Sequence, residues 1–233
     1  MKTIFVTGTD TGVGKTLVSR LLIDHFVALG EKVSPMKPVA SGAEVHDGKL
    51  VNDDAQILLS ASNTDCSYEM VNPYVFEAPI APHVAAEKDR VTIDTHVLNQ
   101  NAKTLAESAD RVIIEGAGGW QVPLTREVSF ADWVSENNWP VVLVVGLRLG
   151  CINHARLTEL DIYAKKNKLL GWVANTIDPD LAYANEIVND LADMIDAPLL
   201  GVIPWLQELD SVQTYLDFTR LPDQITRPDH QNK

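Results

Sequence analysis

Short apolar segments alternate with longer stretches of helical periodicity along most of this 233-residue chain. Runs of about four to eight apolar or β-branched residues bounded by turn-forming residues predict buried strands. By this criterion we expect strands at 3–7, 32–39, 111–115, 140–145, 169–175 and 198–203. Nearly continuous hydrophobic runs, such as 140–145, are typical of parallel strands covered on both faces.

Apolar residues three or four positions apart predict helices between these strands. The expected helices are 15–30, 53–59, 94–108 with Asp94 as the N-cap, 129–134, one starting near 151, and 181–195. Residues 43–52 are polar and expected to form a loop. Residues 72–85 contain three prolines and are expected to be irregular, which in a compact domain often indicates function.

This alternation predicts an α/β fold, a doubly wound and mainly parallel sheet with helices on both faces. We expect one domain over residues 1–221 and a polar, flexible tail over 222–233. Ligands of such sheets bind at the carboxyl ends of the strands. We expect one site there, because several noticeable segments follow these ends: 8–16, Lys37 with Ser41, Glu115 with its glycines, 150–153, Asn175 and Pro204-Trp205.

Composition narrows the functional classes. The net charge of −13 argues against nucleic acid or an anionic membrane as the main partner. No apolar run approaches the ~18 residues of a membrane span. The two cysteines, Cys66 and Cys151, form no framework or CxxC motif, which favours a reducing, cytoplasmic location.

A glycine-rich turn follows the first predicted strand and precedes the first helix. It runs from Gly8 to Gly14 and continues into Lys15 and Thr16. Free N–H groups and the helix dipole attract anions at a helix start, and glycines let loop amides converge on a phosphate. Lys15 can then reach the terminal phosphates, and the Thr16 hydroxyl is suited to Mg²⁺. The alternative is a glycine-rich turn that binds nothing.

The loop departs from the usual phosphate-loop spacing in one respect. Five residues, instead of four, separate Gly8 from Gly14, and Thr9 stands where glycine is expected in the usual pattern. The longer loop points to a particular subfamily of nucleoside triphosphate-binding proteins.

Two acidic residues are candidates for the metal site. Glu115 ends a buried strand and precedes Gly116, Ala117, Gly118 and Gly119. An acid at that position is a common Mg²⁺ partner in phosphate-loop proteins, although it can also cap a neighbouring turn. Asp54 is the second candidate. The alternatives are that Asp54 only caps the helix it starts, or that the neighbouring Asp53 is the metal ligand instead.

Lys37 lies at an apolar strand end between prolines. A buried lysine needs an anion, whereas a snorkelling lysine would keep its head in water. His83 is expected to be structural. Cys151 is not expected to be a nucleophile, because only His154 is placed by sequence to activate it and the helix start after Gly150 suits a carboxylate.

Several motifs together resemble the dethiobiotin synthetase family, whose members have the P-loop NTPase fold. The resemblance spans roughly residues 3–206 and includes the longer phosphate loop. Its segments are Val6–Thr16, Lys37–Gly42, Asn72–Tyr74, Glu115–Trp120, Leu149–His154, Gly171–Asn175 and Ile203–Leu206.

The resemblance implies an ATP- and Mg²⁺-dependent cyclo-ligase of biotin biosynthesis. The family converts 7,8-diaminopelargonic acid, CO₂ and ATP into dethiobiotin, ADP and phosphate. One amine forms a carbamate, the carbamate attacks the γ-phosphate, and the second amine closes the ureido ring. A homodimer is also implied, with the substrate site near the subunit interface.

The resemblance also assigns roles to residues. It implies catalytic roles for Lys37, Lys15 and Thr11, and metal ligation by Thr16, Asp54 and Glu115. Substrate contacts are implied for Ser41, Gly150, Cys151 and Asn153. Nucleotide contacts are implied for Gly12, Val13, Gly14, Lys15, Thr16, Asp54, Glu115, Gly116, Ala117, Gly118, Asn175, Thr176, Pro204, Trp205 and Leu206.

Some features fit the family less well or leave other functions open. The chain after Leu206, including a nucleotide contact near Ser211, matches poorly, and Gly12 stands where the family also uses an acid. A divergent paralogue with another amine substrate is therefore an alternative. A glutamine-dependent amidating synthase would need a further domain. A partitioning-type switch ATPase would carry a lysine at the position of Asp10.

Overall fold

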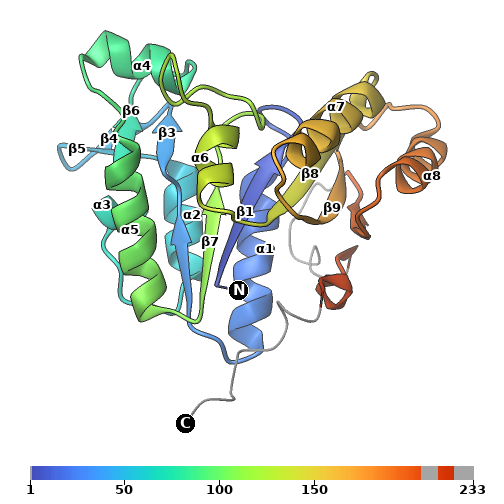
Figure 1. The fold of residues 1–233 in the computed structure, drawn as a ribbon, viewed down its shortest axis with the longest axis horizontal. Coiled ribbons are helices and arrows are strands. Elements are labelled where there is room, and N and C mark those ends of the chain that lie inside the picture. The colour runs from blue at the N-terminus through green and yellow to red at the C-terminus, as the bar shows by residue number, and fades with distance from the viewer. Residues whose placement is uncertain (1, 206–214, 223–233) are drawn as a thin grey trace.

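The computed structural model describes residues 2–205 and 215–222. Its centre is a sheet of six parallel strands in the order β10-β9-β8-β1-β7-β2 (Figure 1). The six strands are β1 (Thr3–Gly8), β2 (Val33–Met36), β7 (Arg111–Glu115), β8 (Val141–Leu147), β9 (Leu169–Thr176) and β10 (Leu199–Ile203). The predicted α/β class is confirmed, and five of the six predicted strands lie in this sheet as expected, whereas the predicted strand 32–39 contributes only β2.

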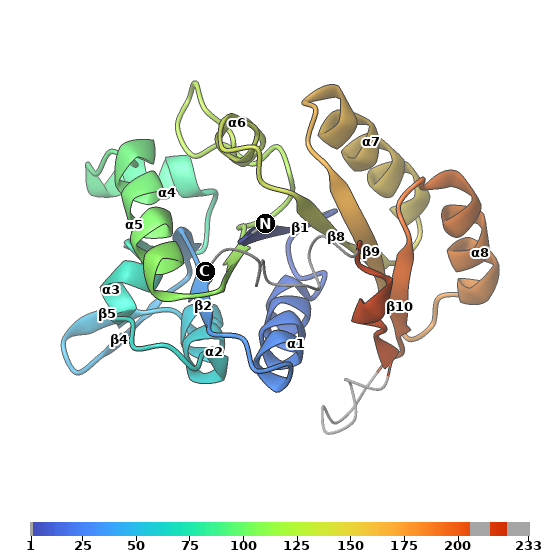
Figure 2. The same cartoon turned by 60° about the horizontal axis from the view of Figure 1, so that its bottom comes forward.

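Helices cover both faces of this sheet. The helices are α1 (Lys15–Ala28), α2 (Asp53–Ala61), α3 (Tyr68–Val71), α4 (Pro82–Asp89), α5 (Thr95–Ser108), α6 (Phe130–Glu136), α7 (Cys151–Ala164), α8 (Ala184–Met194) and the 3₁₀ turn η2 (Phe218–Arg220). Figure 2 shows α1 and α2 on one face and α5 to α8 on the other. Alternate strand residues face the two layers, with Ile4 and Val6 packed in one core cluster and Phe5 in the other.

The second predicted strand is split in the structure. The main-sheet strand β2 ends at Met36, and β3 (Val39–Ser41) pairs in parallel with β6 (Tyr74–Phe76) in a separate two-stranded sheet. Proline explains the break, since Pro38 has no N–H to donate to a ladder. Pro35 is tolerated because β2 is an edge strand of the main sheet.

Two segments expected to be irregular contain regular structure. Residues 43–52 were predicted as a loop but form the hairpin of β4 (Glu44–His46) and β5 (Lys49–Val51). Its turn is Asp47-Gly48, both with positive φ, a dipeptide that favours hairpins. Within residues 72–85, β6 and the start of α4 are regular, with Pro82 in the first turn of the helix.

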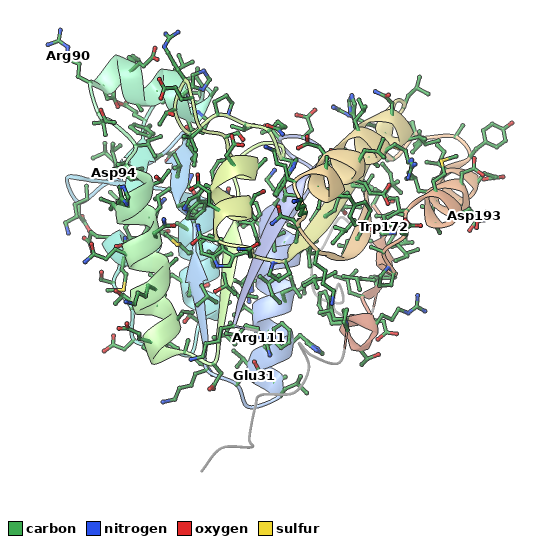
Figure 3. The ribbon with its side chains drawn as sticks, in the orientation of Figure 1. Glu31, Arg90, Asp94, Arg111, Trp172 and Asp193 are labelled. Atoms are coloured by element: carbon green, nitrogen blue, oxygen red, sulfur yellow. The ribbon has the colours of Figure 1, made fainter. Side chains whose placement is uncertain are left out.

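A buried ion pair lies at the amino ends of β2 and β7, the end of the sheet opposite the phosphate loop. The Arg111 guanidinium donates to both Glu31 carboxylate oxygens, at 2.8 and 2.9 Å, and lies over the ring of Phe26 (Figure 3). Bidentate pairing gives this contact a defined geometry. Within residues 2–205 and 215–222, none of the helices combines the length and apolar character needed to span a membrane.

Candidate active site

A cavity of about 590 Å³ lies at the carboxyl ends of β1, β2 and β7. It is lined by Thr11, Gly12, Gly14, Lys15, Thr16, Lys37, Ala40, Ser41, Asn52, Asp54, Pro79, Ile80, Ala81, Pro82, Glu115, Ala117, Gly118 and Val122. A larger and more open hollow of about 930 Å³ lies beside β5, α2 and α3, and its lining includes none of the predicted site residues. Among the described residues, the 590 Å³ cavity therefore combines the phosphate loop with the predicted charged residues Lys15, Lys37, Asp54 and Glu115.

The phosphate loop leads directly into α1. Gly14 precedes the helix with φ of 95°, and no side chain caps the described helix start. A Cβ at this position would lie 2.3 Å from Asn175 Nδ2, which donates to the Val13 carbonyl at 2.8 Å. Glycine is therefore required here by both conformation and space, and the first-turn amides of α1 are left for an anion.

The Lys15 ammonium is hydrogen-bonded to the phosphate loop itself. Its Nζ donates to the main-chain carbonyl of Asp10 at 2.8 Å. Burial, followed by repulsion from Lys37, lowers the Lys15 pKa to about 8. A phosphate would supply the negative charge that favours the protonated ammonium.

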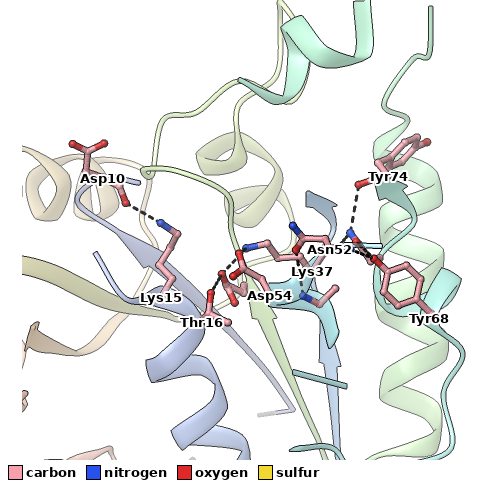
Figure 4. A network of polar contacts seen from close by, with 11 residues as sticks. Asp10, Lys15, Thr16, Lys37, Asn52, Asp54, Tyr68 and Tyr74 are labelled. Carbon is pink, nitrogen blue, oxygen red and sulfur yellow. Dashed lines mark hydrogen bonds and ion pairs between the residues drawn. The ribbon is translucent and has the colours of Figure 1, made fainter. Parts of the chain in front are cut away.

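Lys37 lies between two carboxylates and is only 3% exposed. Its Nζ donates to Glu115 Oε1 at 2.5 Å and to Asp54 Oδ2 at 2.8 Å (Figure 4). Burial disfavours the charged ammonium, but Glu115 and Asp54 outweigh it and raise the Lys37 pKa. The snorkelling alternative is wrong, and Lys37 is a buried cation.

Glu115 and Asp54 both accept hydrogen bonds from the Lys37 ammonium. The Thr16 hydroxyl donates to Glu115 Oε1 at 3.0 Å, whereas Glu115 Oε2 is buried without a hydrogen-bond partner in the part of the chain that the structure describes. Burial, aided by Asp54, raises the Glu115 pKa against the attraction of Lys37. Burial would also raise the Asp54 pKa, but the attraction of Lys37 outweighs it and leaves that pKa lowered.

The capping alternatives for these two acids are wrong. The start of α2 is capped by Asn52, whose side chain accepts from Ala55 N at 3.3 Å. Asp54 pairs with Lys37 instead, and Glu115 pairs with Lys37 and Thr16. The Thr16 hydroxyl and two carboxylates, one of which has the unpartnered oxygen Glu115 Oε2, form a hard-oxygen donor set that fits Mg²⁺.

The structure does not bring every predicted site residue to this cavity. Gly150, Cys151 and Asn153 start α7 and do not line the cavity within one chain. Asn175 ends β9 and contacts the phosphate loop through Val13. Cavity-lining residues also do not include Val13, Gly116, Thr176, Pro204 or Trp205, and Leu206 and Ser211 lie outside the described residues.

Sequence reasoning missed two features of the site. Pro79, Ile80, Ala81 and Pro82 line the cavity. Pro79 and Pro82 mark the irregular segment 72–85 as a candidate functional segment, but the sequence assigns neither of them to the site. An ion pair between Arg148 and Asp10 joins the phosphate loop to the segment before α7. No local pattern in the sequence reveals this pair, because 138 residues separate the partners.

Comparison with known proteins agrees with this geometry. The family model described as an AAA domain matches residues 2–213. The ATP-dependent dethiobiotin synthetase BioD of Nitrosospira multiformis is 46% identical, and the alignment covers 94% of this chain and 96% of that protein. BioD 1 of Escherichia coli K12 is 45% identical, with coverage of 89% and 92%.

Solved structures support the fold alone. The septum site-determining protein MinD of Pyrococcus horikoshii, solved with Mg-ADP, superposes with a TM-score of 0.54 at 17% identity, covering 98% of this chain and 89% of that one. The resemblance seen in the sequence motifs is confirmed by the curated relatives. This chain belongs to the AAA domain family and, within it, to the ATP-dependent dethiobiotin synthetases.

Proposed function

We propose that the protein is an ATP- and Mg²⁺-dependent dethiobiotin synthetase that carboxylates 7,8-diaminopelargonic acid with CO₂ and closes the ureido ring. Products are dethiobiotin, ADP and phosphate, through a carbamate and a carbamic-phosphoric anhydride. The observation that carries this proposal is the cavity shared by the phosphate loop, buried Lys37 and Ser41. Family membership supports the choice of reaction.

The phosphate loop binds the nucleotide. Main-chain amides of Gly12, Val13 and Gly14 and the start of α1 contact the phosphates, which the uncapped helix start supports. The adenine side is formed by Asn175, Thr176, Pro204, Trp205 and Leu206, with Gly116, Ala117 and Gly118 beside the nucleotide. Asn175 is already fixed by its hydrogen bond to the loop.

Lys15 and Lys37 stabilise the charge that develops during phosphoryl transfer. Both lysines are buried and line one cavity, and fixed charges act more strongly on a transition state in a buried setting than in water. Thr11 lies at the same cavity and adds a hydroxyl donor. Removing Lys15 or Lys37 is therefore expected to slow the phosphoryl transfer itself.

Thr16, Asp54 and Glu115 would hold Mg²⁺. Bound there, Mg²⁺ would supply positive charge that neutralises the phosphates. The unpartnered Glu115 Oε2 supports this assignment. Lys37 donates to the same two carboxylates, so their electrostatics and those of the catalytic lysine are coupled.

Ser41 contacts the diamine. Its Oγ is buried and lacks a hydrogen-bond partner among the described residues, while the residue lines the cavity. Burying an unpartnered hydroxyl is unfavourable unless a ligand uses it. The amine end of the substrate therefore lies between Ser41 and the phosphate loop.

A second copy of the chain completes the substrate site. Gly150, Cys151 and Asn153 would hold the substrate carboxylate at the start of α7, and the single-chain cavity lacks them. Leu157 and Leu160 are 58% and 54% exposed and lie three residues apart on one face of α7, and Leu149, just before the helix, is 90% exposed. An exposed apolar stripe continuous with part of the site supports a homodimer. The two unpaired thiols favour the cytoplasm as location.

The test is phosphate release from ATP and Mg²⁺, measured with and without 7,8-diaminopelargonic acid plus bicarbonate, with mass spectrometry of the product. Diamine-dependent release with dethiobiotin as product is expected. ATP binding without diamine-dependent release would return the substrate to unknown, as in a divergent paralogue. Release stimulated by DNA or lipid instead would indicate a switch ATPase.

A further inference from the structure

The backbone of Lys37 is fixed by the end of α3 as well as by its ammonium contacts. Its N–H donates to the Val71 carbonyl at 2.8 Å, and its carbonyl accepts from Asn72 Nδ2 at 2.6 Å. The main chain on either side of Lys37 Cα is thus hydrogen-bonded to two consecutive residues. The position from which the lysine side chain extends therefore depends on α3.

The start of α2, which carries Asp54, is fixed from the same place. Asn52 caps α2 through its side chain, and its own N–H donates to the Tyr68 hydroxyl at 2.8 Å. Asn52 is 8% exposed, so this N–H would be poorly hydrated without the tyrosine. Tyr68 thereby influences where the Asp54 carboxylate lies.

The Tyr68 hydroxyl joins these two attachments. It accepts from the Asn52 N–H and donates to Asn72 Oδ1 at 2.9 Å, so both its donor and its acceptor capacity are used. The chain of contacts from the Lys37 carbonyl through Asn72 and Tyr68 to α2 is closed by the 2.8 Å pair between Lys37 Nζ and Asp54 (Figure 4).

From this closed circuit we infer that Tyr68 is a positioning residue. Its hydroxyl sets the separation of α2 from the Lys37 segment and so holds the Lys37 ammonium in its catalytic position. Tyr68 does not line the 590 Å³ cavity, so it acts only through other residues. The inference rests on the proposed function for the role of Lys37 in phosphoryl transfer.

Replacing Tyr68 by phenylalanine removes one oxygen and leaves the ring in the wall of the 930 Å³ hollow beside β5, α2 and α3. Loss of a hydrogen-bonded link of this kind should lower kcat about three- to tenfold. The KM for ATP should change less than kcat, because the circuit reaches the nucleotide site only through Asp54 and does not include the phosphate loop. A merely structural role would lower stability without this division between kcat and KM.

Tyr74→Phe is the matched control. The Tyr74 hydroxyl also accepts a backbone N–H, that of Asp94 at 2.9 Å, but it joins β6 to the start of α5. Only the main-chain carbonyl of Tyr74 contacts the circuit, by accepting from Asn72 Nδ2 at 3.4 Å, and phenylalanine keeps that carbonyl. We therefore expect kcat of Tyr74→Phe to stay within about twofold of the parent protein, since the Tyr74 hydroxyl lies outside the circuit. Equal losses in Tyr68→Phe and Tyr74→Phe would overturn the inference.

A double-mutant cycle with Lys37→Gln tests the route of the effect. Without the ammonium, removing the Tyr68 hydroxyl should cost no further phosphate release. Independent, multiplicative losses in the double variant would show that Tyr68 acts elsewhere, and would overturn the inference.

Nitrogen NMR of lysine-labelled protein supplies a readout independent of turnover. The Lys37 ammonium signal, assigned by its absence in Lys37→Gln, should shift in Tyr68→Phe and remain in place in Tyr74→Phe. An unmoved signal in Tyr68→Phe would overturn the inference. If the parent protein shows no diamine-dependent phosphate release, the proposed function fails, yet this spectrum still decides whether Tyr68 positions Lys37.

Discussion

Lys15 Nζ donates to the main-chain carbonyl of Asp10, five residues earlier in the same loop, at 2.8 Å. The ammonium that should meet the ATP phosphates is thus held by a neutral acceptor in a buried setting. Its charge is consequently less stable than that of an ordinary lysine, and nucleotide binding should compete directly with this contact.

The first prediction concerns pH. Because the Lys15 pKa is lowered to about 8, the nucleotide-free protein loses this positive charge as pH rises through 8. ATP favours the charged form, so its Kd should rise by up to about tenfold per pH unit above that point. Titration calorimetry between pH 7 and 9.5 measures this slope. Lys15→Met should bind weakly with no such slope, and a flat profile in the parent protein would contradict the prediction.

Lys37→Gln should lower diamine-dependent phosphate release by about 100- to 1,000-fold, as expected for a group acting on developing charge. ATP binding should persist, since the phosphate loop is untouched. Single-turnover kinetics and calorimetry separate the two effects. Lys49→Gln is the control, because Lys49 is a lysine whose partner is the exposed Glu69. Near-normal turnover in Lys37→Gln would remove Lys37 from the catalytic residues.

Gly14→Ala should weaken ATP binding at least about tenfold, because the left-handed conformation alone costs about 1–2 kcal/mol and the added methyl group meets Asn175. Gly30→Ala shares the positive φ but has nothing within 4 Å of the added Cβ. It should lose about 1 kcal/mol of stability and keep its ATP affinity. Calorimetry and urea unfolding compare them, and equal affinity in both variants would argue against the Gly14–Asn175 contact.

Cys151→Ser should retain activity within about twofold, because serine keeps the main chain of this buried residue at the start of α7 and the proposed reaction uses no thiol nucleophile. A stability loss of about 1 kcal/mol is expected from burying a hydroxyl. Product formation and thermal unfolding are measured beside Cys66→Ser. Complete loss of activity in a folded Cys151→Ser protein would show that it is a nucleophile.

The double substitution Leu157→Asp with Leu160→Asp should convert a dimer to monomers, since it puts charge on the exposed stripe of α7. Light scattering reports the mass, and product formation should fall while ATP binding persists. Val45→Asp alters an equally exposed residue on β4 and should change neither. A monomeric parent protein with full activity would refute the shared substrate site.

Local patterns were sufficient for much of the fold. Apolar runs gave the six main strands, and helix periodicity with capping signals gave helices such as α5, whose N-cap Asp94 accepts from His96 N at 2.8 Å. Local patterns failed for residues 43–52, where a turn dipeptide specifies a hairpin that has no hydrophobic alternation. The hairpin at 44–51 has mostly exposed residues, so burial left no alternating signal, and Asp47-Gly48 alone specified its turn.

The sequence by itself determined which residues could carry charge at the phosphate loop, because a strand, a glycine-rich turn and Lys15-Thr16 are consecutive. The tertiary structure decided how those charges are paired. Lys37 pairs with Asp54 across 17 residues and with Glu115 across 78. The Tyr68 hydroxyl connects Asn52, at the start of α2, to Asn72, which binds the Lys37 carbonyl. Such pairings depend on how strands are ordered in the sheet and on which groups are desolvated together, and neither property is encoded in a local window of sequence.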